Sequence, residues 1–243
     1  MSLDSRPYWE NAGSLGYRQA MFSSDAVAHH ITRRMWQIAL EFGWQLGLRP
    51  ESRILDLGCG DGAFTNEVLA ANFAMVDGFD FSEAAIRQAQ SKAPSEQINF
   101  RARDITRLNP GDFRVYDGAF LIGILHHVKP SAPALIRTMS RSLPRIVVLE
   151  PNGNNLLRRL LEWTPTYQAA GEASFTTRRV RTMFEQAGYR CLNWRRLNLF
   201  PNFTPKRVFR LCGPLEPMIE QTPILRALCT VNMYGFQLAA SLS

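Results

Sequence analysis

The sequence predicts an α/β protein in which helices flank a doubly wound, mainly parallel β-sheet. From residue 53 onward, short apolar runs alternate with segments whose apolar residues recur at helical spacing, a pattern typical of strands joined by crossover helices. A glycine-rich turn follows the first apolar run and opens a helix. The 243 residues are 46% hydrophobic and 20% charged, a composition that supports a buried core and excludes a disordered chain.

The elements are expected in a regular order along the chain. A first helix over 24–48 follows Ser23, Ser24 and Asp25, which are residue types that begin helices. Seven strands are expected over 54–57, 74–79, 98–102, 115–122, 146–149, 189–199 and 231–242. Further helices are expected over 63–71, 82–92, 132–141, 153–163 and 176–187, and a proline-interrupted helical stretch over 206–228.

Composition narrows the function classes. The four cysteines, Cys59, Cys191, Cys212 and Cys229, have no CxxC spacing, which argues against a zinc site and fits a reducing compartment. With no leader-like start and no long apolar run, the protein is expected to be cytoplasmic.

Charge is unevenly distributed along the chain. Residues 1–120 hold 12 basic and 15 acidic residues, whereas residues 121–243 hold 16 and 6. The basic half suits an anionic partner or an ordinary solvated surface.

The strongest motif is Ile54-Leu-Asp-Leu-Gly-Cys-Gly-Asp-Gly62, an apolar strand followed by a glycine-rich turn. Glycine allows a sharp turn and a close approach of a ligand to the backbone. Gly58, Gly60 and Ala63 alone also satisfy the dinucleotide fingerprint GxGxxA. Asp56 and Asp61 would repel a pyrophosphate but attract an ammonium or sulfonium group, so the charge pattern favours a cationic cofactor.

Around this turn the chain resembles the class I S-adenosylmethionine-dependent methyltransferases, over roughly residues 50–151. ILDLGCGDG at 54–62 is similar to the first motif of that family, and further motifs follow in the family's order: GFDFSEAAIRQAQ at 78–90, FRARDIT at 100–106, YDGAFLIGILHHV at 116–128 and RIVVLEPNG at 145–153. The resemblance implies S-adenosylmethionine as cofactor and S-adenosylhomocysteine as its product.

The resemblance also implies roles for individual residues. Asp80 would accept hydrogen bonds from the ribose hydroxyls, and Phe81 would flank the adenine. Asp104 would accept from the adenine amino group, while the Ile105 amide would donate to the ring. The expected cofactor-binding set is Asp56, Gly58, Cys59, Gly60, Asp61, Gly62, Asp80, Phe81, Asp104, Ile105 and Ile122.

The fold that the resemblance implies is Rossmann-like. It has a seven-stranded sheet whose last strand is antiparallel. Residues 1–50 would form an N-terminal helical cap or lid, and residues 51–243 the methyltransferase domain, with 200–230 as an insertion on the substrate side.

Candidate catalytic and substrate residues lie at the expected rim of the sheet. His126 and His127 follow the fourth run, where one of them would act as the base that deprotonates a hydroxyl, and the other would be structural. No metal is expected, because two histidines and a carboxylate do not make a magnesium-like oxygen shell. Weaker substrate candidates are Tyr17, His30, Glu150, Asn152 and Asn155.

The expected activity is methyl transfer to a small molecule, most readily to a hydroxyl of an apolar, aromatic or lipid-like metabolite of secondary metabolism. A nucleic-acid acceptor such as tRNA or rRNA, and an NAD(P)-dependent oxidoreductase, stay open as alternatives. Apolar residues interleaved with Lys206, Arg207, Arg210 and Arg226 also suit a peripheral membrane contact, although an apolar face packed on the last strands accounts for the same pattern.

Overall fold

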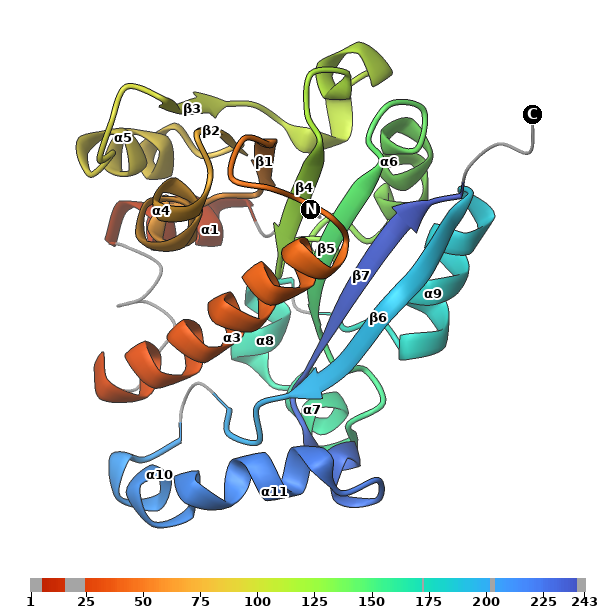
Figure 1. Cartoon of the computed structure of the whole chain (residues 1–243). Coiled ribbons are helices and arrows are strands. Elements are labelled where there is room, and N and C mark those ends of the chain that lie inside the picture. Colours follow the sequence, from red (N-terminus) through yellow and green to blue (C-terminus); the bar gives the residue numbers. More distant parts are fainter. Residues whose placement is uncertain (1–5, 16–24, 172, 202–203, 240–243) are drawn as a thin grey trace.

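The protein is described by a computed structural model that covers residues 6–15, 25–171, 173–201 and 204–239 (Figure 1). Seven strands form one sheet in the order β3-β2-β1-β4-β5-β7-β6. β7 is antiparallel to both neighbours and every other neighbouring pair is parallel, so the predicted seven-stranded sheet with an antiparallel last strand is confirmed. The strands are β1 (Arg53–Leu57), β2 (Met75–Asp80), β3 (Ile98–Ala102), β4 (Gly118–Ile122), β5 (Arg145–Pro151), β6 (Tyr189–Leu197) and β7 (Val231–Leu238).

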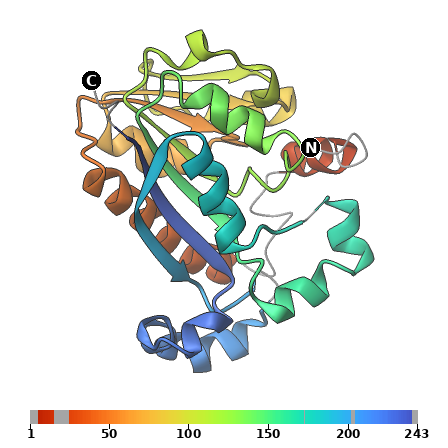
Figure 2. The same ribbon diagram turned by 90° about the vertical axis from the view of Figure 1, so that its right-hand side faces the viewer.

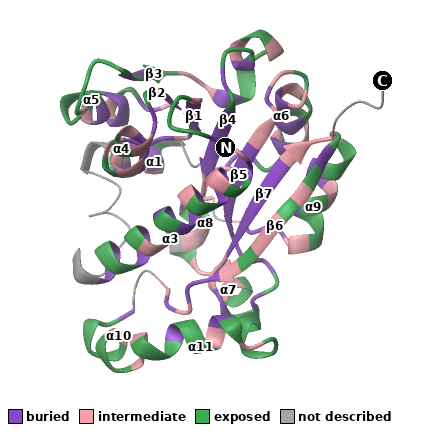
Figure 3. Cartoon of the chain, viewed as in Figure 1, coloured by how far each residue is buried: buried purple, intermediate pink, exposed green. Residues whose placement is uncertain are grey.

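Helices cover both faces of the sheet, because apolar side chains of the strands point to each face and have to be buried. On one face the strands pack against α3 (Asp25–Gln45), the π-helical turn η2 (Thr65–Leu69) with α4 (Ala70–Asn72), and α5 (Glu83–Ser91). On the other face they pack against η3 (Ile105–Arg107), η4 (Pro110–Phe113), α6 (Ala132–Met139) and α9 (Thr177–Gln186). The central strands β4, β5 and β7 are therefore buried along most of their length (Figure 3).

The helix expected over 24–48 is α3, and it shares the core of the sheet. Phe42 on this helix and Leu46, directly after it, pack in one cluster with Ile54, Phe120 and Val147 of the strands. Burial of these apolar side chains holds the C-terminal half of α3 against the sheet. Its N-terminal half extends past the strand ends (Figure 1).

Several expected boundaries differ from the structure, and at two of them local hydrogen bonds and prolines end the regular elements. The strand expected over 115–122 begins only at Gly118, since Asn109 and Asp112 form a capping box around η4. The stretch over 206–228 is divided into α10 (Lys206–Cys212), η5 (Gly213–Leu215), α11 (Glu216–Gln221) and η6 (Leu225–Leu228), with prolines at 214, 217 and 223.

Short helices surround the carboxyl ends of the strands. α1 (Arg6–Leu15) lies against α5, and α7 (Leu156–Leu161) and α8 (Pro165–Ala169) follow β5. α10 and α11, between β6 and β7, lie together at one end of the molecule (Figure 2). In the part of the chain that is described, no helix is both long and apolar enough to cross a membrane.

Candidate functional site

A cavity of about 330 Å³ lies where the strand order reverses. β1 and β4 are neighbours in the sheet although two strands separate them in sequence, so the connections at their carboxyl ends diverge and leave a crevice. The cavity wall includes residues from the turns after β1, β2, β4 and β5, from α1 and α3, and from both ends of the β6 to β7 connection.

The turn after β1 approaches its neighbours so closely that it requires glycine. Gly58 has a φ of +77°, and a Cβ there would lie 2.5 Å from Cγ1 of Ile124. The amides of Gly58 and Cys59 donate to the carbonyl of Phe79 at 2.7 and 3.1 Å, which places the turn beside the end of β2. The glycine-rich motif therefore brings its backbone next to Asp80.

Asp80 is a buried carboxylate that joins the two turns. Its Oδ2 accepts from the amide of Gly60 at 3.1 Å, and its Oδ1 accepts from the amide of Ser82 at 2.9 Å. Burial raises its pKa to about 6, although these backbone hydrogen bonds favour the ionised form. The carboxylate is therefore held in place by the backbone while it lines the cavity.

Asp56 and Asp61 bring two more carboxyl groups to the same wall. Asp56 accepts from the hydroxyl of Thr65 at 2.6 Å, and burial raises its pKa to about 7. Asp61 is also buried and lines the cavity. Three carboxyl groups in one wall fit a ligand with positive charge and hydroxyl groups, and they would repel a pyrophosphate. This cluster of carboxyl groups suits S-adenosylmethionine better than a nicotinamide dinucleotide.

Eight of the eleven expected cofactor residues line the cavity: Asp56, Gly58, Cys59, Gly60, Asp61, Asp80, Phe81 and Ile122. The other three lie elsewhere. Gly62, at φ +74°, faces Ala89 and Phe100. Asp104 caps η3 by accepting from the amide of Thr106 at 3.0 Å, and Ile105 packs in the core against the sheet. The adenine roles of Asp104 and Ile105 stay predictions.

His126 and Glu150 form a buried pair beside the cavity. Nδ1 of His126 lies 2.9 Å from Oε2 of Glu150, whose Oε1 accepts from the amide of Leu125 at 2.8 Å. The Glu150 side chain is fully buried and does not reach the cavity wall, whereas His126 does. Residues from the ends of two neighbouring strands, β4 and β5, thus fix the position of one imidazole.

The pairing has a chemical consequence for His126. A carboxylate accepts hydrogen bonds, so this pairing favours the neutral tautomer of His126 with the proton on Nδ1, in which Nε2 can accept a hydrogen bond. Nε2 lies on the opposite edge of the ring from Nδ1. This arrangement can remove a proton from a ligand hydroxyl.

His127 lies beside His126, with their ring centroids 3.9 Å apart. The ring centroids of His127 and Trp9 lie 4.5 Å apart in a T-shaped arrangement, and Trp9 donates from Nε1 to the carbonyl of Ala170 at 2.8 Å. α1 is thereby tied to the segment after α8 across the cavity wall.

The expected substrate residues are scattered. Tyr17 lies outside the described residues. His30 is exposed on α3 and does not line the cavity. Its Nε2 lies 3.5 Å from Oε2 of Glu216. Asn152 is fully buried and donates to the carbonyl of Cys229 at 2.9 Å. Asn155 lines the cavity, but it also caps α7 and donates to the carbonyl of Leu228 at 2.7 Å.

Sequence reasoning missed part of the wall. Trp9, Met35 and Trp36 come from the N-terminal helices, and Arg158 and Tyr167 come from α7 and α8. The guanidinium of Arg158 lies 5.0 Å from the ring centroid of Tyr167. An aromatic residue in a polar segment, such as Trp9 beside Glu10 and Asn11, was the available signal for such positions. No group of three metal-binding side chains occurs among the residues that the structure describes.

Comparison with known proteins is consistent with this geometry. Residues 54–145 match the family model of a methyltransferase domain. An O-methyltransferase, cnsE, of Penicillium expansum is 30% identical over 149 residues, which are 59% of this chain and 49% of that protein. The 27-O-demethylrifamycin SV methyltransferase of Amycolatopsis mediterranei is 31% identical over 112 residues, which are 44% of this chain and 38% of that protein. The chain thus spans about half or less of the length of these relatives.

A solved structure matches nearly the whole chain. Magnesium protoporphyrin IX methyltransferase from Synechocystis PCC 6803 with bound SAH has a TM-score of 0.65. The match covers 96% of this chain and 98% of that chain at 18% identity. At that identity the likeness concerns the fold, which extends over all seven strands and the helices around them.

Proposed function

We propose that this chain is a class I S-adenosylmethionine-dependent methyltransferase and that it methylates a hydroxyl group of an apolar small molecule. One observation carries the proposal. A single cavity is lined both by a cluster of carboxyl groups and by a histidine whose Nδ1 is held by a buried glutamate. The first suits a cationic cofactor and the second suits removal of a hydroxyl proton.

The cofactor would lie along the turns after β1 and β2. S-adenosylmethionine supplies a methyl group on a positively charged sulfur, so the carbon needs no further activation. Asp80, held by the amides of Gly60 and Ser82, would accept from the ribose hydroxyls. Asp56 and Asp61 would attract the positive groups, and Phe81 would contact the adenine.

His126 would act as the general base. Glu150 keeps Nδ1 protonated, so Nε2 is free of a proton and accepts one from the acceptor hydroxyl as the oxygen attacks. The pair also fixes the direction from which the hydroxyl approaches, and alignment is a large part of what an in-line displacement requires.

An apolar or aromatic acceptor is supported by the rest of the wall. Apart from Arg158, Asn155 and Asn198, the segments away from the glycine-rich turn contribute mainly apolar and aromatic side chains: Ile31, Met35, Trp36, Leu157, Leu161, Tyr167, Leu199, Pro201 and Leu228. The names of the two relatives, an O-methyltransferase and a 27-O-demethylrifamycin SV methyltransferase, support an oxygen acceptor and a secondary metabolite.

Titration calorimetry with S-adenosylhomocysteine tests the cofactor assignment. We expect micromolar binding to the wild-type protein and a loss of at least tenfold in affinity for Asp80→Asn, which keeps the shape of the side chain but removes its charge. Glu83→Gln removes an exposed carboxylate three residues away and should bind like the wild type. Transfer of radioactive methyl groups from S-adenosylmethionine to phenolic, glycosidic and polyprenyl-phenol acceptors then tests the acceptor class.

Binding of NAD or NADP in place of S-adenosylhomocysteine would contradict the cofactor assignment. Cofactor binding accompanied by methylation of tRNA or rRNA, but of no small hydroxylated molecule, would contradict the acceptor class.

A further inference from the structure

One end of the molecule exposes an unusual number of large apolar side chains. They belong to α7 with the residues that follow it (156–163) and to the segment 204–228, which we call the apolar end. Leu156 is 81% exposed, Trp163 77%, Leu211 80% and Ile224 83%. Val208, Leu215, Met218 and Leu160 are also exposed there. Figure 3 shows that α10 and α11 are largely exposed, whereas the sheet next to them is not. A contiguous surface of this kind is typical of an interaction site.

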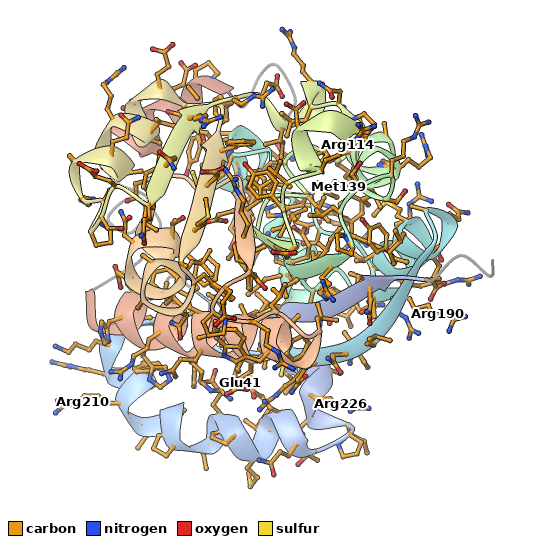
Figure 4. The ribbon with its side chains drawn as sticks, turned by 45° about the horizontal axis from the view of Figure 1, so that its top comes forward. Glu41, Arg114, Met139, Arg190, Arg210 and Arg226 are labelled. Atoms are coloured by element: carbon orange, nitrogen blue, oxygen red, sulfur yellow. The ribbon has the colours of Figure 1, made fainter. Side chains whose placement is uncertain are left out.

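The exposed charges at the apolar end are all basic. Among its described residues these are Arg159, Lys206, Arg207, Arg210 and Arg226. Figure 4 shows Arg210 pointing away from the molecule at this end, whereas the guanidinium of Arg226 lies 5.8 Å from the ring centroid of Trp194. The surface therefore combines exposed apolar side chains with uncompensated positive charge.

The three carboxylates of the same segments are withdrawn from the surface and already paired. Glu220 lies within 2.6 Å of the guanidinium of Arg34, and Glu216 within 3.2 Å of the same group. The third, Glu162, accepts from the amide of Ser174 at 2.8 Å. None of them is available to neutralise the exposed arginines.

The cavity opens onto this surface. Leu157 and Leu228 are both more than half exposed, and both line the cavity. Asn155 links their two segments by donating to the carbonyl of Leu228 at 2.7 Å. The apolar cavity wall is thus continuous with the apolar end.

We propose that the apolar end docks onto the surface of an anionic lipid membrane. Leucine, isoleucine and tryptophan side chains enter the acyl region while arginine and lysine contact lipid headgroups, and the two contributions strengthen each other. A nucleic acid would neutralise the arginines but leave the apolar side chains in water, so a lipid surface satisfies both features. This inference goes beyond the proposed function and does not depend on it.

Co-sedimentation with lipid vesicles tests the proposal, and it needs neither cofactor nor acceptor. We expect the wild-type protein to sediment with phosphatidylcholine vesicles that contain phosphatidylglycerol, and much less with phosphatidylcholine alone. Arg207→Glu with Arg210→Glu should lower the partition coefficient by about tenfold or more. Leu211→Ser with Ile224→Ser should lower it by a similar factor.

Arg114→Glu with Arg190→Glu is the matched control, because it makes the same charge change at exposed sites outside the apolar end (Figure 4). This variant should sediment like the wild type, and circular dichroism should show that every variant is folded.

Three outcomes would overturn the proposal. One is a failure of the folded wild-type protein to bind vesicles of either composition. Another is a loss of vesicle binding in the control variant as large as that in Arg207→Glu with Arg210→Glu. That result would assign binding to the overall charge of the protein. The third is a wild-type dimer in sedimentation velocity that becomes a monomer in Leu211→Ser with Ile224→Ser while vesicle binding is unchanged, which would assign the surface to a second copy of the chain. Since calorimetry with S-adenosylhomocysteine is independent, failure of docking and failure of the proposed function are distinguishable.

Discussion

At the scale of single residues, the pairing of His126 with Glu150 fixes the orientation of one imidazole ring at the cavity wall. A histidine on a cavity wall has two possible neutral tautomers, and only one leaves Nε2 ready to accept a proton. Glu150 selects that tautomer because its second oxygen is already held by the amide of Leu125. In the proposed reaction Glu150 would therefore be a positioning residue, and His126 would be the group that meets the acceptor.

Replacing either partner should slow methyl transfer. Glu150→Gln presents an amide to Nδ1 and favours the tautomer in which Nε2 carries the proton, so kcat should fall by about tenfold or more. His126→Gln should have an effect at least as large, and KM for S-adenosylmethionine should stay near its wild-type value in both. Because the two residues act as one unit, the double variant should be no slower than His126→Gln.

Steady-state kinetics with a saturating acceptor checks this prediction. His127→Gln is the comparison within the same segment. Additive losses in the double variant would show that Glu150 acts independently of His126. A tenfold loss in His127→Gln alone would move the base to the neighbouring ring.

The buried carboxyl of Asp56 should make stability depend on pH. Its pKa is about 7 in the folded protein, against an ordinary value of 3.8, because burial disfavours the charged form. Between pH 3.8 and about 7 the folded state therefore holds a proton that the unfolded state has released. The free energy of unfolding falls as pH rises through this range. Asp56→Asn keeps an oxygen for Thr65 and does not titrate. At pH 8 it should be roughly 1–3 kcal/mol more stable than the wild type.

Urea unfolding at pH 5 and pH 8 measures this difference. The gain in free energy of unfolding should be larger at pH 8 than at pH 5. Glu83→Gln, which changes an exposed carboxylate, should leave the pH dependence unchanged. An Asp56→Asn protein with the same pH dependence as the wild type would show that Asp56 titrates at its ordinary value.

At the scale of elements, α11 is held to the domain by charged groups more than by apolar packing. The guanidinium of Arg34 on α3 donates to both oxygens of Glu220 at 2.6 and 2.5 Å. The carboxylate oxygens of Glu220 and Glu216 also accept from the amides of Asn198 and Leu199, which follow β6. α11 exposes much of its apolar surface. These hydrogen bonds therefore hold α11 beside the mouth of the cavity.

Removing Glu220 should destabilise the protein. Glu220→Ala leaves the guanidinium of Arg34 and the amide of Asn198 without that acceptor, and it should lower the free energy of unfolding by roughly 2–4 kcal/mol. Glu185→Ala breaks a half-exposed ion pair with Arg181 on α9 and should change the free energy of unfolding by about 0–1 kcal/mol. Urea unfolding compares the two. Equal effects would show that the charged contacts of α11 are no stronger than an ordinary surface pair.

At the scale of the whole molecule, the cavity is built from segments that are far apart in the chain. The sheet contributes the glycine-rich turn and the ends of β2, β4 and β5, and helices before and after it complete the wall. α1 contacts the segment after α8 through Trp9 and Ala170, although 161 positions separate them in sequence. Two segments of the apolar end, 156–163 and 204–228, also contribute Leu157 and Leu228 to the cavity wall, so acceptor binding and membrane docking would share one surface.

The sequence by itself determined the order of strands and helices, the glycine-rich turn and the carboxylates beside it. These features are readable because each depends on a contiguous stretch: apolar periodicity, a glycine turn after Leu57, and an aspartate at the end of β2. The positions of Asp56, Asp61 and Asp80 in the cavity wall follow from the rule that parallel strands end at one edge of the sheet. Capping residues shifted the ends of elements, and prolines divided the stretch over 206–228 into four short helices.

Only the tertiary structure decided which distant groups meet. Glu150 was a weak substrate candidate in the sequence, but the parallel pairing of β4 with β5 places it against Nδ1 of His126. Arg34 and Glu220 are 186 positions apart, and no local pattern links them. Trp9 and Arg158 enter the wall through packing of helices whose own sequences specify an amphipathic surface but not its partner. Local preferences act within a few residues, whereas these contacts depend on how the whole chain closes around the crevice.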